Sequence, residues 1–84
     1  MPASIEIAIA HDGQVAVGGR VVGDASVGAL KRALLDAAGD QKDPLVVINA
    51  DRETGFQKVV DALDAARQAG FPRVTFPTKF RNQE

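Results

Sequence analysis

Few side chains in this 84-residue chain could carry out chemistry, and a group of carboxylates is the best candidate. Asp51 directly follows the apolar run 45–48, and three other acidic residues are near it in sequence: Asp40, Asp43 and Glu53. Ligand groups often lie just past the carboxyl end of a strand, and carboxylate oxygens suit divalent cations. The alternative is structural, because an aspartate between a strand and a helix commonly accepts hydrogen bonds from backbone amides. We favour this structural role for Asp51.

The other candidates for catalysis are isolated. His11 is the single histidine and has only Asp12 beside it, whereas a general base or metal ligand needs further partners. The glycines at 18, 19 and 23 do not form a phosphate loop, since neither G-x-G-x-x-G nor Gly-Lys-Ser/Thr occurs. There is no cysteine and no G-x-S-x-G elbow. An enzyme that uses Asp51 and His11 is thus the weakest hypothesis, and we expect a non-enzymatic module without cofactor or metal.

Charge and composition exclude further classes. The chain has ten basic and eleven acidic residues, without a basic stripe, so we expect no nucleic-acid binding. It has no Trp, no Tyr and four Phe, which leaves few surfaces for stacking on bases or sugars. No apolar run approaches the roughly 18 residues that a membrane-spanning helix needs, and residues 1–10 do not resemble a signal peptide. The length fits one domain, residues 1–84.

The first half of the chain predicts a hairpin followed by a helix. Residues 4–10 alternate, with Ile5, Ile7 and Ile9 facing the core. Asp12-Gly13 predicts a hairpin turn, Gly18-Gly19 predicts a second turn, and residues 20–22 form at most a short edge segment. A helix is expected to begin near Asp24 or Ser26 and to end at Gly39; its apolar stripe comprises Val27, Leu30, Leu34 and Ala37 or Ala38.

The second half predicts one βαβ unit. The continuous apolar run 45–48 indicates a central strand with a neighbour on each side. Thr54 and Gln57 fit a capping box at the start of a second helix, which Gly70 ends. The expected buried stripe of this helix comprises Phe56, Val59, Val60, Leu63 and Ala66. Residues 74–76 form the last strand, and Pro77 marks its end.

These elements predict an α+β fold. The order β-β-α-β-α-β gives a two-layer sandwich, with two helices on one face of a mixed sheet. The folded core is expected over residues 3–78, followed by a flexible tail at 79–84. The opposite face of the sheet, which carries Glu6, Ala8, Gln14 and Ala16, is solvated or faces a partner.

Two strands are candidates for contacts with other chains. The N-terminal strand could exchange between two copies, and the last strand could leave an edge to which another strand adds. The expected partner or dimer contacts are Ile5, Ile7, Ile9, Val74 and Phe76. Four other residues are expected to have structural roles: Asp51, Thr54, Phe56 and Gly70.

The order of these features resembles the periplasmic domain of the ExbD/TolR family of biopolymer-transport proteins, over about residues 5–78. The hairpin IEIAIAHDGQVAVGGRVV is one part of the likeness. The stronger part is a block of spaced residues: Ala50-Asp51, Phe56, Val59-Val60, Leu63-Asp64, Ala66 and Ala69-Gly70, followed by Val74 and Thr78. The Gly-Gly turn and the short segment after it resemble the ExbD form more than the TolR form. Phe56 departs from the tyrosine that is usual in the family.

The resemblance implies a periplasmic domain of a single-pass inner-membrane protein, whose transmembrane helix we expect outside these 84 residues. It implies a homodimer that works with an ExbB/TolQ-type membrane subunit and a TonB/TolA-type protein, driven by the proton-motive force. The family's proton-carrying aspartate belongs to the transmembrane helix, so that role does not pass to Asp51. Two alternatives stay open: a TolR-like subunit that contacts peptidoglycan, and a stand-alone cytosolic binding module.

Overall fold

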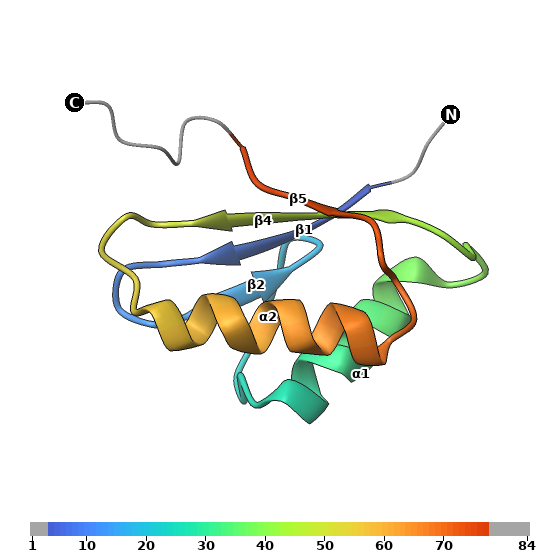
Figure 1. Ribbon diagram of the computed structural model, residues 1–84. Helices are drawn as coiled ribbons and strands as arrows, with labels where there is room; N and C mark the ends of the chain where they lie inside the picture. The colour runs from blue at the N-terminus through green and yellow to red at the C-terminus, as the bar shows by residue number, and fades with distance from the viewer. Residues whose placement is uncertain (1–3, 78–84) are drawn as a thin grey trace.

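Figure 1 shows a computed structural model of the chain, which describes residues 4–77. Its elements, in chain order, are β1 (Ser4–Ile9), β2 (Val15–Val17), β3 (Arg20–Val22), α1 (Val27–Ala38), β4 (Leu45–Ala50), α2 (Phe56–Gln68) and β5 (Val74–Thr75). Both helices lie against the same face of the sheet, which confirms the predicted two-layer α+β sandwich. The short edge segment expected at 20–22 is β3, an edge strand of the sheet, so the observed order has one strand more than the predicted β-β-α-β-α-β. Ala3, Thr78 and the expected tail at 79–84 lie outside the described residues.

The sheet is mixed, with the strand order β3-β2-β1-β4-β5. β1 pairs antiparallel with β2 and parallel with β4, so that Ile7 lies opposite both Val17 and Ile48. β4 also pairs with β5 in parallel, and therefore has a neighbour on each side, as its apolar run predicted. β4, α2 and β5 form the expected βαβ unit.

Short-range features of the sequence determine where α1 begins and where β2 turns into β3. Ser26 caps α1, because its Oγ accepts a hydrogen bond from the backbone N–H of Ala29 at 3.2 Å. Gly18 and Gly19 join β2 to β3 with φ angles of 61° and 85°. Positive φ at both positions of a two-residue turn matches the right-handed twist of the flanking strands, and glycine adopts it without a steric penalty.

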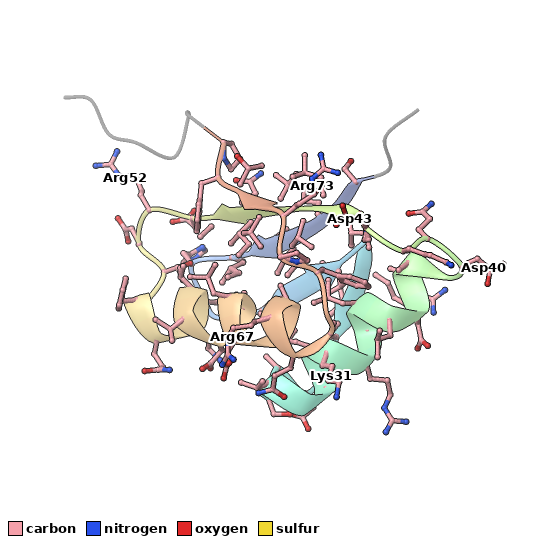
Figure 2. All side chains as sticks on the ribbon, turned by 45° about the vertical axis from the view of Figure 1, so that its right-hand side comes forward. Lys31, Asp40, Asp43, Arg52, Arg67 and Arg73 are labelled. Atoms are coloured by element: carbon pink, nitrogen blue, oxygen red, sulfur yellow. The ribbon has the colours of Figure 1, made fainter. Side chains whose placement is uncertain are left out.

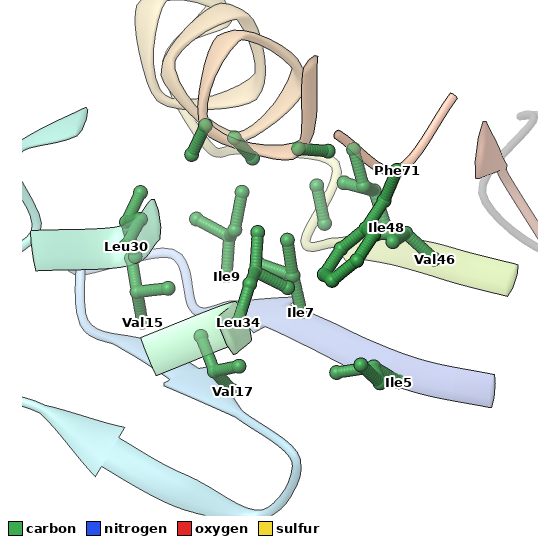
Figure 3. Packing of buried hydrophobic residues seen from close by; sticks show 14 of the residues in the cluster. Ile5, Ile7, Ile9, Val15, Val17, Leu30, Leu34, Val46, Ile48 and Phe71 are labelled. Atoms are coloured by element: carbon green, nitrogen blue, oxygen red, sulfur yellow. The ribbon is translucent and has the colours of Figure 1, made fainter. Parts of the chain in front are cut away.

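The core lies between the sheet and the helices (Figure 3). Ile5, Ile7 and Ile9 point into it from β1, as the alternation in the sequence predicted. Leu30 and Leu34 meet them from α1. The remaining buried hydrophobic residues are Val15, Val17, Ala38, Val46, Ile48, Ala50, Ala62, Ala65, Ala66 and Phe71.

The buried stripe of α2 differs from the prediction. Phe56 was expected to be buried but is 79% exposed, and Leu63 is 38% exposed. The fully buried positions of this helix are the alanines 62, 65 and 66. Phe56 is the first residue of α2 and lies seven residues before Leu63, so both side chains lie on the same outward side of the helix. Small alanine side chains let α2 pack against both α1 and the sheet, which rotates the larger apolar residues toward the outside.

Candidate interaction site at the edge of β5

The free edge of β5 is the first feature of the candidate site. β5 pairs with β4 through Val74 and Thr75, and no strand within residues 4–77 lies on its other side. The Val46 N–H donates to the Arg73 carbonyl at 2.8 Å, so Arg73 and Thr75 direct their backbone groups toward β4. Backbone groups alternate in direction along a strand. The N–H and C=O of Val74 therefore face outward, where a further strand could pair with them.

A mainly apolar groove runs beside this edge, between β5 and α2. It has a volume of about 660 Å³, and its lining residues are Val60, Leu63, Asp64, Arg67, Phe71, Pro72 and Val74. Phe71 is 5% exposed and packs into the core, whereas Leu63 at 38% and Phe76 at 39% leave apolar surface on the outside. Every second side chain of a strand added at β5 would point toward this groove.

The end of α2 places the side chains of this groove. The helix ends at Gln68, and Gly70 follows with a φ of 86°. The Phe71 N–H donates to the Ala66 carbonyl at 3.0 Å, a bond of the kind that folds a chain back over a helix end. Pro72 then leads into β5. This turn brings Phe71 into the lining of the groove together with Leu63 and Val60.

Charged pairs lie at the rim of the site (Figure 2). Arg67 forms an ion pair with Asp64 on α2, and its own side chain is mostly exposed. Arg73 reaches Asp43 at 3.5 Å, which ties the segment before β5 to the loop before β4. Exposed ion pairs such as these contribute at most about 1 kcal/mol to stability. On α2 the rim therefore carries one negative residue, Asp64, and one positive residue, Arg67, which suits a partner segment of mixed charge.

The isoleucines of the predicted interface occupy a different place. Ile5, Ile7 and Ile9 are at most 4% exposed, and β1 lies between β2 and β4 in the middle of the sheet. Within this fold, any contact through these side chains would use residues that the chain already buries. Val74 and Phe76, in contrast, lie at the edge described above. The edge of β5 is therefore the part of the predicted interface that a partner can reach in this fold.

Asp51 lies at a corner that joins β4 to β1. Its Oδ1 accepts a hydrogen bond from the Glu53 N–H at 2.9 Å, and its own N–H donates to the Ile9 carbonyl at 2.8 Å. The predicted capping box is wrong: Gly55 is the N-cap residue of α2, and no side chain caps this helix. The Thr54 hydroxyl donates instead to the carbonyl of Ala10 at 3.1 Å, with Ile9 O at 3.4 Å. Thr54 therefore binds the end of β1.

The structure separates the carboxylates that were considered for metal binding. Asp43 precedes β4 and Asp51 follows it, so the six-residue strand keeps them roughly 20 Å apart. In Figure 2 Asp40 and Arg52, the neighbour of Asp51, lie at opposite ends of the molecule. Within residues 4–77, no three His, Cys, Asp or Glu side chains are grouped so that they could hold a metal ion. His11 lies in the exposed turn after β1.

The sequence analysis missed the groove because it placed only Ala66, and not Ala62 and Ala65, on the buried side of α2. Val60, Leu63 and Arg67 follow one another at spacings of three and four, which describes a single side of a helix. Ala62, Ala65, Ala66 and Ala69 describe a second, smaller side. Two apolar sides on one helix, one of them small, are the signal that could have revealed an outward-facing apolar groove.

The chain also matches known proteins. Residues 2–80 match the family described as Biopolymer transport protein ExbD/TolR. Biopolymer transport protein ExbD of Neisseria gonorrhoeae is 30% identical over 79 residues, and so are the ExbD proteins of two Neisseria meningitidis strains, of serogroups B and C. Each alignment covers 94% of this chain but 55% of the relative, so the chain spans about half the length of these proteins. No helix within residues 4–77 is long and apolar enough to cross a membrane. The match over nearly the whole chain shows that it belongs to the ExbD/TolR family of biopolymer transport proteins.

Proposed function

We propose that this chain is the periplasmic domain of an ExbD-like subunit of an energy-transduction complex driven by the proton-motive force. The complex would include an ExbB-like membrane subunit and a TonB-like protein, and would power transport across the outer membrane. The observation that supports this proposal is the family match over residues 2–80, together with relatives named ExbD. The name of these relatives favours the ExbD form over the TolR form.

In this proposal the domain works by contact and carries out no chemistry of its own. The transmembrane anchor belongs to the remaining part of a longer protein, as the partial coverage of the relatives suggests. The edge of β5 supplies the contact with a TonB-like protein or with a second copy. A partner strand would bond the outward N–H and C=O of Val74, and its apolar side chains would enter the groove between β5 and α2.

A proline at position 74 tests this contact. Val74→Pro removes a backbone donor that faces away from β4, so pairing between β4 and β5 keeps its hydrogen bonds. Thr75→Pro removes the donor that faces β4 and serves as the control for damage to the sheet. Both variants are made in the full-length protein in its native host. We expect Val74→Pro to abolish crosslinking to the TonB-like protein and energy-dependent uptake, while far-UV circular dichroism of the isolated chain stays unchanged.

A second substitution tests the same contact independently, in case the proline variant fails to fold. Leu63→Lys places a charge in the groove at a position that is already 38% exposed, so it leaves the core intact. It should weaken the same crosslink at least tenfold. If both variants keep normal crosslinking and uptake, the β5 edge is not the contact. Co-sedimentation of the chain with purified peptidoglycan, without a TonB-like contact, would favour a TolR-like subunit instead.

A further inference from the structure

The face of the sheet that points away from the helices is a second surface, distinct from the β5 edge. Both helices lie on one side, and no helix or strand of residues 4–77 covers the other (Figure 1). Val46 and Ile48 are buried beneath the helices, so Leu45 and Val47 point to the bare side, where they are half-buried. The sheet is mixed: β1, β4 and β5 are parallel, the arrangement that is usually covered on both faces, whereas β2 and β3 pair antiparallel, an arrangement that can leave one face to water.

The strand register gives this face a hollow centre. Val21, Ala16, Ala8 and Asn49 lie side by side in one row across β3, β2, β1 and β4. The two alanines are small, and Val21, which is 62% exposed, stands at one side of them. A hollow of about 330 Å³ results, and Ala8, Ala16, Val21 and Asn49 are among its lining residues. We refer to this surface as the open face; it is formed by Glu6, Ala8, Ala16, Val21, Leu45 and Val47.

Two carboxylates lie on this side of the sheet: Glu6 belongs to the open face itself, and Asp51 lines the hollow. Glu6 is next to Val47 in the neighbouring row, and its Oε2 accepts a hydrogen bond from Asn49 Nδ2 at 3.0 Å. The ion pairs within residues 4–77 join Asp64 to Arg67 and Asp43 to Arg73, so neither of them neutralises Glu6. A cation placed above the open face would therefore meet a carboxylate that Asn49 already holds in position.

The chemistry of the open face limits what can cover it. β1 and β4 have strand neighbours on both sides, so their backbone groups are used within the sheet and the face offers side chains only. An extended peptide laid across it would lose water from its own N–H and C=O groups without gaining partners, which is costly. A helix bonds its backbone internally and presents side chains alone. A helix is therefore the element that fits.

We propose that the open face is a docking surface for an amphipathic helix of a partner protein. This helix would present small and branched apolar side chains to Ala8, Ala16 and Val47, and a Lys or Arg to Glu6. A second copy of this chain fits less well. It would bring another Glu6 carboxylate, and Arg73, a basic residue that alternation along β5 places on the same side of the sheet, is already paired with Asp43. This proposal does not depend on the contact at β5.

Two synthetic helical peptides of about 15 residues test the proposal. Both carry one Leu/Ala stripe, with a central Lys in one peptide and Glu in the other, and are titrated into the ¹⁵N-labelled chain. We expect the Lys peptide to shift the amide signals of Ala8, Ala16 and Val47. It should bind about fivefold tighter than the Glu peptide, the ratio for an ion pair worth about 1 kcal/mol. In Glu6→Lys the preference should invert. Glu53→Lys makes the same change of charge in the loop after β4 and should leave the preference unchanged.

Several results would overturn the proposal. Equal affinity for the two peptides, or no binding at about 1 mM, would exclude the stated chemistry. Signal shifts confined to Leu63, Phe71 and Val74 would assign the peptides to the groove beside β5. Dimerisation of the free chain that is abolished by Val47→Lys, measured by analytical ultracentrifugation, would show that a second copy covers the open face.

Discussion

Thr54 offers a sharp test of how the chain holds the corner between β4 and α2. Its hydroxyl donates to the Ala10 carbonyl at 3.1 Å, with Ile9 O at 3.4 Å, and so connects the loop after β4 to the end of β1. Thr54→Val keeps the shape of the side chain and removes this donor. A hydrogen bond of this kind contributes about 1 kcal/mol to the free energy of unfolding. We therefore expect Thr54→Val to lower this free energy by about that amount.

The measurement is urea-induced unfolding, followed by far-UV circular dichroism because the chain has neither Trp nor Tyr. In a domain of this size a loss of 1 kcal/mol corresponds to a fall in Tm of about 4–8 °C. Thr54→Ser keeps the hydroxyl and should recover most of the stability. The m value should stay constant, since none of these changes alters the surface exposed on unfolding.

Gln57→Ala is the control that separates this explanation from a capping box. Gln57 is exposed, and its amide donates to Asp61 at 2.8 Å, one turn along the same helix. Such a pair contributes about 0.2–0.5 kcal/mol, so the Ala variant should be nearly as stable as the parent chain. If Gln57→Ala cost as much as Thr54→Val, or if Thr54→Val cost nothing, the explanation in terms of the β1 carbonyls would be refuted.

Two further predictions concern the orientation of α2. Phe56→Ser should change the free energy of unfolding by no more than about 0.5 kcal/mol, because Phe56 is 79% exposed. Loss of a buried ring would lower this free energy by about 3–5 kcal/mol, and calorimetry distinguishes the two outcomes. Ala65→Leu should destabilise the chain by about 1–3 kcal/mol, because position 65 has no exposed surface and must accommodate three more carbon atoms. Urea-induced unfolding measures this loss, and a midpoint equal to that of the parent chain would argue against the tight packing of α2.

The sequence predicted those parts of the fold that short-range patterns determine. Alternation placed Ile5, Ile7 and Ile9 in the core, the Gly-Gly pair marked the turn between β2 and β3, and Ser26 capped α1. Each of these depends on residues within a few positions of one another. The apolar run in β4 correctly indicated neighbours on both sides, although the pairing partners are far away in sequence.

The errors occurred where long-range contacts compete with local patterns. Thr54 and Gln57 have the spacing of a capping box, but the end of β1, about 45 residues earlier, supplies the acceptor that Thr54 uses. Phe56 was assigned to the core as the first position of an apolar stripe, whereas the helix buries Ala62 and Ala65, whose small side chains let it approach α1. Neither the distant carbonyl nor the closeness of two helices is visible in a local window of sequence.

The two proposed contact surfaces, the edge of β5 and the open face, would recognise different properties of a partner, and this difference follows from the strand order. At an edge the backbone is available, so Val74 can bond an extended segment of almost any sequence, and selectivity comes from the groove alone. On a face the backbone is already used, so Glu6 and the apolar residues around it must select by side-chain shape and charge. Val74 and Glu6 are two strands apart, roughly 10 Å, and their side chains point to opposite faces of the sheet. A single partner segment cannot satisfy both requirements at once, so occupation of the two surfaces would take two segments or two partners. If both proposed contacts exist, contact at one surface could change while the other stays bound, as the proposed role of a subunit that works by contact requires.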